Sequence, residues 1–395
     1  MTQRDHARIL IYSPDTFGLG RLRRCLAVAN ALAGQFKGLF VLIISGTQVP
    51  TAMGLRARVD FVKIPSVIKL YDGQYTSMGE HIDLRDTLAI RRTIIRNTAE
   101  SFDPDLMIVD DELCGLAPEI HDTLEMLKSR DCKITLALPD LIDTTLEQRK
   151  VWKRTKVVTA IDRIYDHIWI YGAQRFARPL EEVDAPAKLL SKVTYTGYLR
   201  RNIPRRSSTF EPPFTNPYIL VTTDDSDAGA DLMDWMLTAY EHDATLPHPC
   251  LLVLNPLLPA AKRKIIRGRT ARMENVRVIE FEEGTASLMP GAVGVVTTPE
   301  YDAFCQLLSF DKRAILVPQN AGRPSQENRA ARAAELKLAR TIAPAEARDP
   351  YLLAEALHAF PTNPLPSRSG CADMLTGLET ICSQIGQYIK HPAQI

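Results

Sequence analysis

The chain has 395 residues, 48 lysines and arginines against 47 aspartates and glutamates, and a formal net charge of +1. Hydrophobic residues make up 45% and charged residues 24%, which is typical of globular domains and excludes a disordered, collagen-like or coiled-coil chain. The balanced charge gives no electrostatic reason to expect a nucleic-acid partner. The length predicts two domains of roughly 150–200 residues each.

The seven cysteines are scattered and form no CxxC pair, which favours reduced thiols over a zinc or redox site. The N-terminus is polar and then strand-like, unlike a signal peptide. The longest apolar run, residues 38–44, is far shorter than the roughly 20 residues that span a bilayer. We therefore expect a cytoplasmic protein with at most a peripheral membrane contact, for which the apolar and basic segment 55–75 is the candidate.

Short β-branched runs alternate with longer segments of helical period, which is typical of α/β proteins with parallel sheets. In the first half, the predicted strands span residues 8–12, 39–44, 60–64, 106–110, 134–138, 167–171 and 193–195. The predicted helices between them span residues 22–34, 84–100, 117–130 and 147–160.

A basic stretch rich in proline and serine follows at 200–216 and predicts an interdomain linker. A second α/β pattern then has predicted strands at 218–222, 251–254, 276–281, 293–297 and 314–317. Its predicted helices span 231–241, 260–271, 303–310, 326–336 and 350–360.

These patterns predict a Rossmann-like domain over residues 1–199, a second one over 217–370, and a C-terminal amphipathic helix over 371–395. We expect the two domains to face each other across a cleft. Ligands of open parallel sheets bind at the carboxyl ends of the strands, so the functional site is expected there.

The first predicted strand leads into a loop that contains Gly18 and Gly20. Both glycines let the backbone turn tightly and approach a ligand closely. The helix start that follows presents unpaired N–H groups that suit an anion, and Arg21 adds a positive charge. The dinucleotide-binding pattern GxGxxG fails because Arg23 occupies the third glycine position. The alternative is an ordinary turn with solvent-facing arginines.

This loop resembles the opening loop of GT-B glycosyltransferases related to the bacterial enzyme that adds N-acetylglucosamine to the peptidoglycan precursor (glycosyltransferase family 28). The matching residues are Ser13, Asp15, Thr16, Phe17, Gly18, Leu19, Gly20, Arg23 and Arg24, while two family histidines become Pro14 and Arg21. Further similar segments lie at 65–69, 72–75, 102–110, 165–172 and 195–198, so the resemblance covers nearly the whole chain. It implies an α/β fold of two Rossmann-like domains and transfer of a sugar from a nucleotide-sugar donor, of the uridine type, to an acceptor held by the first domain.

The resemblance assigns donor binding to the second domain. The implied donor-binding residues are Thr223, Phe281, Glu282, Tyr301, Gln306 and Gln326. The family's ribose-binding glutamate is Gln306 here, which keeps a carbonyl acceptor but loses the charge. Gln326 has the alternative reading of a solvent-facing residue at a helix start.

The family's glycine-rich phosphate loop is acidic in this chain, with Asp224, Asp225 and Asp227. Carboxylates repel a diphosphate by Coulomb's law. They are also ligands that Mg²⁺ accepts, but Ser226 and Asp227 are equally typical helix caps, and we favour that interpretation. We therefore expect no metal and no cofactor other than the substrate.

Glycosyl transfer requires a base near the acceptor hydroxyl. Asp15 is the first candidate, with hydrogen bonds to its own turn as the alternative role. Asp110, followed by Asp111 and Glu112, closes a strand at the expected ligand edge and is the second candidate. Arg21 stays protonated and so cannot be a base, but it could hold a phosphate or an anionic acceptor.

Three functions follow. The leading one is a glycosyltransferase with a UDP-linked donor and an unknown acceptor, such as a lipid-linked sugar or a polysaccharide. The second is a catalytically degenerate relative that binds a sugar, nucleotide or protein partner, because Pro14, Arg21, the acidic loop and Gln306 all depart from the family. The third is a nucleotide-sugar epimerase, which would have the same architecture.

Overall fold

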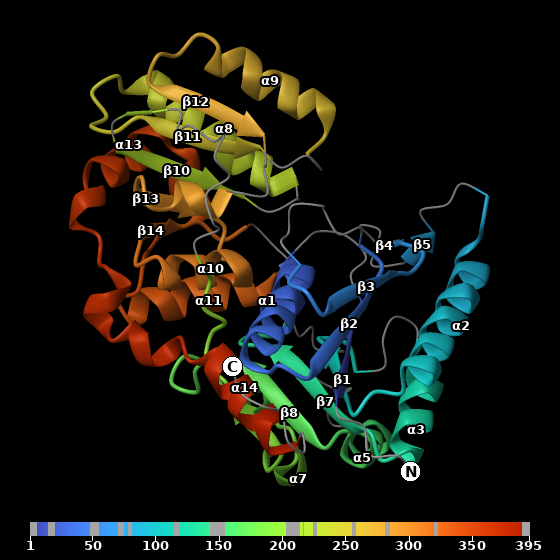
Figure 1. The fold of residues 1–395 in the computed structure, drawn as a ribbon. Helices are drawn as coiled ribbons and strands as arrows, with labels where there is room; N and C mark the ends of the chain where they lie inside the picture. Colours follow the sequence, from blue (N-terminus) through green and yellow to red (C-terminus); the bar gives the residue numbers. More distant parts are fainter. Residues whose placement is uncertain are drawn as a thin grey trace. The chain divides into compact units, whose positions relative to one another are not determined.

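The computed structural model (Figure 1) describes residues 6–14, 20–47, 55–69, 75–77, 81–113, 118–142, 155–202, 214–215, 217–223, 227–254, 258–280, 285–319 and 323–388. The chain divides into two units. The first comprises Met1–Leu199 and Thr376–Ile395, and the second comprises Arg200–Leu375. None of the described helices is long and apolar enough to cross a membrane.

The first unit contains a seven-stranded parallel sheet with the order β3-β2-β1-β6-β7-β8-β9. The strands are β1 (Ala7–Ser13), β2 (Leu39–Ser45), β3 (Val59–Lys63), β6 (Leu106–Asp110), β7 (Lys133–Pro139), β8 (His167–Tyr171) and β9 (Val193–Tyr195). The order runs outward in both directions from β1, as in doubly wound Rossmann-like sheets. A short antiparallel hairpin of β4 (Val67–Lys69) and β5 (Tyr75–Ser77) follows β3.

The helices of the first unit are α1 (Gly20–Gln35), α2 (Leu84–Phe102), α3 (His121–Ser129), α5 (Thr155–Ile164), α6 (Pro179–Glu182), α7 (Ala187–Leu190) and α14 (Gly377–Tyr388). Central strands such as β1 and β6 are buried along most of their length, because helices cover both faces of a parallel sheet. In α2, the side chain of Asp83 caps the first turn by accepting a hydrogen bond from the Asp86 amide at 2.8 Å.

The second unit contains a six-stranded parallel sheet with the order β12-β11-β10-β13-β14-β15. Counted within the unit, this is the Rossmann order 3-2-1-4-5-6. The strands are β10 (Tyr218–Thr222), β11 (Cys250–Leu254), β12 (Val276–Glu280), β13 (Ala292–Thr297), β14 (Arg313–Leu316) and β15 (Arg340–Thr341).

The α-helices of the second unit are α8 (Asp227–His242), α9 (Ala260–Thr270), α10 (Tyr301–Ser309), α11 (Pro324–Glu335), α12 (Pro344–Arg348) and α13 (Pro350–His358). Short 3-10 helices are η1 (Thr285–Leu288), η2 (Phe360–Thr362), η3 (Pro366–Ser369) and η4 (Cys371–Met374).

The last helix, α14, packs in the first unit although the second unit precedes it in sequence. The Thr376 hydroxyl donates to the Thr196 carbonyl at 3.0 Å, and the Gly377 amide donates to the Tyr198 carbonyl at 3.1 Å. Ile381 and Ile385 are buried. A Cβ on Gly377 would lie 2.6 Å from the Gly197 carbonyl oxygen, so only glycine permits this close approach.

The predicted α/β fold is confirmed, and every predicted strand coincides with an observed one to within one residue at each end. Three helix predictions need correction. The predicted helix 147–160 overlaps α5, which ends at Ile164 rather than at residue 160, while residues 143–154 lie outside the described part of the chain. The predicted helix 117–130 begins at His121.

The third correction concerns the tail. The predicted C-terminal helix over 371–395 is the 3-10 helix η4 followed by α14, and the helix is interrupted between them, where Gly377 approaches the backbone at Gly197. Most of the predicted linker 200–216 lies outside the described residues.

Candidate active site

In the first unit, the strand order reverses between β1 and β6, so the carboxyl ends of these strands border the expected ligand position. β1 ends at Ser13 and α1 begins at Gly20. The predicted base Asp15 and the predicted Gly18 lie between these two residues, outside the described part. Gly20 is exposed, and a Cβ there would meet nothing within 4 Å. Ligand-binding roles for this loop stay predictions.

Asp110 ends β6 and is fully buried. Arg24 of α1 holds it with two hydrogen bonds, from Nε to Oδ1 at 3.0 Å and from Nη2 to Oδ2 at 2.8 Å. Burial raises the pKa of Asp110, and the Arg24 guanidinium opposes that shift. Arg24 also lies over the ring of Tyr171, 5.4 Å from its centre. Both oxygens of Asp110 are thus engaged, and its contact joins α1 to the sheet; its role as a base stays a prediction.

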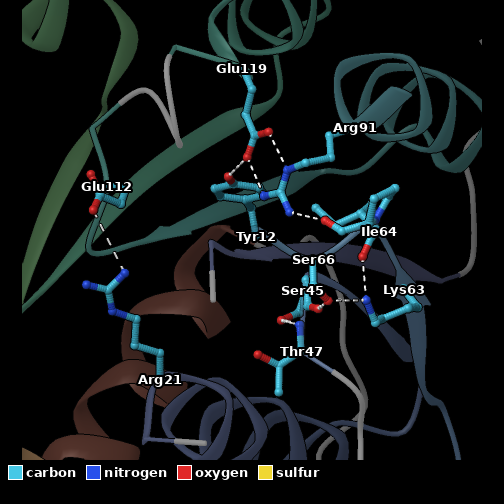
Figure 2. A network of polar contacts seen from close by, with 12 residues as sticks. Tyr12, Arg21, Ser45, Thr47, Lys63, Ile64, Ser66, Arg91, Glu112 and Glu119 are labelled. Carbon is cyan, nitrogen blue, oxygen red and sulfur yellow. Dashed lines mark hydrogen bonds and ion pairs between the residues drawn. The ribbon is translucent and has the colours of Figure 1, made fainter. Parts of the chain in front are cut away.

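Arg21 faces two carboxylates rather than an empty anion site. Its Nη2 lies 2.9 Å from Asp111 Oδ2. Its Nη1 lies 3.8 Å from Glu112 Oε1, and this second contact is drawn in Figure 2. Asp111 adopts a left-handed backbone with φ of 65°, which turns the chain sharply after β6. The pKa of Tyr75 is raised by burial and by Glu112, so the β4–β5 hairpin lies near this cluster.

A second buried network lies at the same edge (Figure 2). Arg91 of α2 donates from Nε to Glu119 Oε2 and from Nη2 to Glu119 Oε1, both at 2.6 Å. Its Nη1 donates to the Pro65 carbonyl at 2.6 Å, and the Tyr12 hydroxyl donates to Glu119 Oε1. Arg91 and Glu119 are both buried. The network therefore links the end of β1 to α2, to the chain before α3 and to the loop after β3.

Lys63, the last residue of β3, ties two further loops to this edge. Its Nζ donates to the Ile64 carbonyl at 2.6 Å and to Ser66 Oγ at 2.8 Å, while Ser66 Oγ donates to the Gly46 carbonyl at 2.5 Å (Figure 2). Burial and the nearby charge of Arg91 lower the pKa of Lys63. The loops after β2 and β3 are thus held by direct hydrogen bonds.

In the second unit, the strand order reverses between β10 and β13. The hydroxyls of Thr222 and Thr297, which end these strands, hydrogen-bond to each other at 3.1 Å. The predicted donor residue Thr223 comes next, and its buried hydroxyl has no hydrogen-bond partner among the described residues. The predicted Phe281 and Glu282 lie outside the described residues.

The acidic loop is largely outside the described part as well, since only Asp227 is included, as the first residue of α8. The described residues contain no group of three or more histidine, cysteine, aspartate or glutamate side chains that could hold a metal ion. The alternative of a metal at Asp224, Asp225 and Asp227 is therefore left untested.

Tyr301 is the first residue of α10, and Gln306 lies further along the same helix. Tyr301 is buried. The Gln306 amide donates to Asp302 Oδ2 at 2.9 Å, and Arg201 Nη2 lies 2.7 Å from Asp302 Oδ1. The predicted ribose-binding Gln306 is thus joined to a carboxylate one helical turn earlier, a partner that the sequence interpretation missed.

Gln326 is fully buried rather than solvent-facing. Its Oε1 accepts a hydrogen bond from the Gln319 amide at 2.9 Å, and its Nε2 donates to Glu300 Oε1 at 2.6 Å. Glu300 also accepts from Arg323 Nη1 at 2.7 Å. The side chain therefore fixes the loops after β13 and β14 at the ligand edge of this sheet.

Among these residues, Arg24, Arg91, Glu119 and Glu300 were not identified as partners from the sequence. A signal existed for Arg91, which falls on the buried stripe of α2 with Thr87, Ile95 and Ala99, each four residues from the next. An arginine on an apolar stripe needs a buried acceptor. The acceptor itself, Glu119, follows a loop and has no comparable pattern.

No protein-family model matches the chain, and no curated protein sequence matches it. Solved structures do. The glycosyltransferase of kitacinnamycin matches with a TM-score of 0.63 at 13% identity, covering 98% of this chain and 99% of its own. A UDP-glucosyltransferase from Polygonum tinctorium matches with a TM-score of 0.63 at 11% identity, with the same coverage. The spinosyn rhamnosyltransferase SpnG, complexed with thymidine diphosphate, matches with a TM-score of 0.60 at 11% identity, covering 96% and 99%.

The likeness extends over nearly the whole of each chain, so both Rossmann-like units take part in it. The chain has the GT-B fold of these glycosyltransferases. At sequence identities this low, the likeness shows the fold alone.

Proposed function

We propose that this protein is a glycosyltransferase that moves a sugar from a UDP-linked donor to an acceptor hydroxyl. The observation that carries the proposal is the GT-B likeness over 98% of the chain to enzymes of this activity. Polar side chains at the switch points of both sheets support it, because ligands of such sheets bind there. The family 28 resemblance of the loop sequences favours uridine as the base.

In this proposal, the second unit binds the donor. Tyr301 and Gln306 on α10 contact the nucleoside part, with Thr223, Phe281 and Glu282 from neighbouring loops. Gln326 acts as a positioning residue, since both ends of its amide are occupied by Gln319 and Glu300. It sets the loops that meet the donor rather than contacting the sugar itself.

The first unit binds the acceptor, and Asp15 serves as the base. The acceptor oxygen attacks the anomeric carbon of the donor and forms the new glycosidic bond. The bond from that carbon to the phosphate oxygen breaks, UDP leaves with the electron pair, and the hydroxyl proton passes to the Asp15 carboxylate. Arg24 holds Asp110 and thereby anchors the helix that follows the Asp15 loop.

A thermal-shift titration with UDP, GDP, TDP and CDP, with and without Mg²⁺, tests donor binding. A ligand that binds only the folded state at ~100 times its Kd stabilises that state by about 2.7 kcal/mol, which is easily seen. We expect a shift with UDP alone among the four. A shift that requires Mg²⁺ would contradict the metal-free site, and no shift with any of them would favour the degenerate binding protein.

Turnover of a labelled UDP-sugar tests the chemistry. We expect Asp15→Asn to abolish transfer while keeping the UDP-induced shift, and Gln326→Ala to weaken that shift. Gln35→Ala, an exposed residue of α1, is the control. Wild-type turnover in Asp15→Asn would remove Asp15 as the base. Interconversion of the sugar without any acceptor would identify an epimerase instead.

A further inference from the structure

Helix α9 of the second unit is strongly basic. Its sequence includes Lys262, Arg263, Lys264, Arg267 and Arg269, and Arg272 is the second residue after its end. The helix packs on α8 and β12 through the buried Ile266 and Thr270 (gold in Figure 1). Clustered cations on one short helix create a local positive potential, which attracts anionic partners.

Only part of this charge is balanced within the unit. Arg269 pairs with Asp234 and Glu241 of α8, and Arg263 and Arg267 share the single carboxylate of Glu280. Asp234 and Glu241 belong to α8 and Glu280 belongs to β12, the two elements on which α9 packs. The side chains of Lys264 and Arg272 have no hydrogen bond or ion pair in the described part of the chain.

The unpaired cations lie on one exposed stripe. With 100° of rotation per residue, positions 261, 264, 265 and 268 of α9 fall on the side opposite Ile266 and Thr270, and all four are exposed, as is Arg272 just beyond the end of the helix. The stripe has no acid. It does have Ile265, whose side chain is 60% exposed, and a Cβ on Gly268 would meet nothing within 4 Å. No described residue of the unit covers this surface.

We propose that this stripe of α9 binds the surface of a membrane that contains anionic phospholipid. Lys264 and Arg272 would pair with lipid phosphates, and Ile265 between them would insert its apolar side chain among the headgroups. An anionic bilayer attracts nearby Lys and Arg side chains, and burial of the exposed Ile265 side chain among the headgroups adds to the binding. The exposed isoleucine favours a lipid surface over a nucleic acid, which offers phosphates without an apolar layer beneath them.

Vesicle sedimentation tests the proposal on the full chain. We expect binding to phosphatidylglycerol–phosphatidylcholine vesicles at low salt, weaker binding at high salt because surface charges are screened, and no binding to phosphatidylcholine alone. The double reversal Lys264→Glu/Arg272→Glu should lower the partition coefficient by at least about tenfold. Ile265→Ser should lower it severalfold without any change of charge.

Two matched controls use the first unit. Lys37→Glu/Arg85→Glu changes the net charge equally at exposed positions, and Ile90→Ser removes an isoleucine that is 40% exposed. Both should bind vesicles like wild type. Equal losses in the α9 variants and their controls, or no vesicle binding by wild type, would overturn the proposal. Binding to a short single-stranded RNA that displaces the vesicles and depends only on the charges would overturn it in favour of nucleic acid.

Discussion

Arg24 and Arg91 lie on different helices, yet both are buried and each donates two hydrogen bonds to a buried carboxylate at one edge of the first sheet. A buried ion pair offsets the cost of its desolvation only when its other hydrogen-bonding groups also have partners. Arg91 and Glu119 come close to this condition, because the Pro65 carbonyl accepts a further hydrogen bond from Arg91 and the Tyr12 hydroxyl donates one to Glu119. Such pairs fix the positions of the helices and loops at this edge more than they stabilise the fold.

Removal of one partner should therefore be costly. We expect Arg91→Ala to lower the free energy of unfolding by about 3–5 kcal/mol, because Glu119 would be left buried without its counterion. Arg91→Met/Glu119→Gln should lose less, since no charge is stranded. Urea unfolding followed by circular dichroism measures both.

The control is Arg96→Ala on the exposed side of the same helix, which should change the free energy of unfolding by less than about 0.5 kcal/mol. Equal losses for Arg91→Ala and Arg96→Ala would show that the buried pair contributes nothing.

At the scale of elements, the strands were predictable and the helix ends were less so. Strands such as β6 and β10 are continuous apolar runs bounded by polar turns, a pattern that the sequence presents directly. The β4–β5 hairpin was missed because each strand has three residues, too few to show an alternation. The break before α14 depends on a backbone contact with residues 197 and 198, and no local pattern predicts a contact over 180 positions.

That contact leads to a prediction about two glycines of α14. A Cβ on Gly377 would lie 2.6 and 2.7 Å from two backbone carbonyl oxygens, so Gly377→Ala should destabilise the protein by about 1–3 kcal/mol. A Cβ on Gly386 would lie 3.6 Å from the Phe36 ring, an ordinary contact. Gly386→Ala should be neutral or stabilising by up to about 1 kcal/mol, because alanine favours the helix. Thermal unfolding that ranks the two variants the other way would contradict the close approach.

A second element-scale prediction concerns the ends of α8 and α13. Asp243 accepts hydrogen bonds from Thr245 and from His358 Nε2, and these partners lower its pKa to about 2. A carboxyl with a depressed folded pKa stabilises the fold above its unfolded pKa, near 3.9, and that contribution is lost as the pH falls towards 2.

The Tm of wild type should therefore exceed that of Asp243→Asn at pH 6, and the difference should shrink between about pH 4 and pH 2. Scanning calorimetry of both proteins over this range measures it. A difference that stays constant down to pH 2.5 would show that Asp243 does not titrate with the fold.

At the scale of the whole molecule, both sheets have the Rossmann order, and this could be predicted from the alternation of strand and helix patterns. The candidate site could be predicted only in outline. Strand ends such as Asp110 and Thr223 follow from topology, whereas the partner of each polar side chain does not. Gln326 illustrates the limit, because its position at a helix start was evident but its burial depends on Gln319 and Glu300, which other loops bring to it.

The return of α14 to the first unit has a consequence for synthesis of the protein on the ribosome. Residues 1–199 emerge first, but the helix that covers part of α1 emerges only after the whole of Arg200–Leu375, a delay on the order of ten seconds or more at ordinary translation rates. During that time the unit lacks the helix that buries Ile381 and Ile385 against it. The amino-terminal unit is therefore the first to be started and the last to be finished, and a ribosome that stalls within the second unit would leave a nascent chain with an unfinished apolar surface.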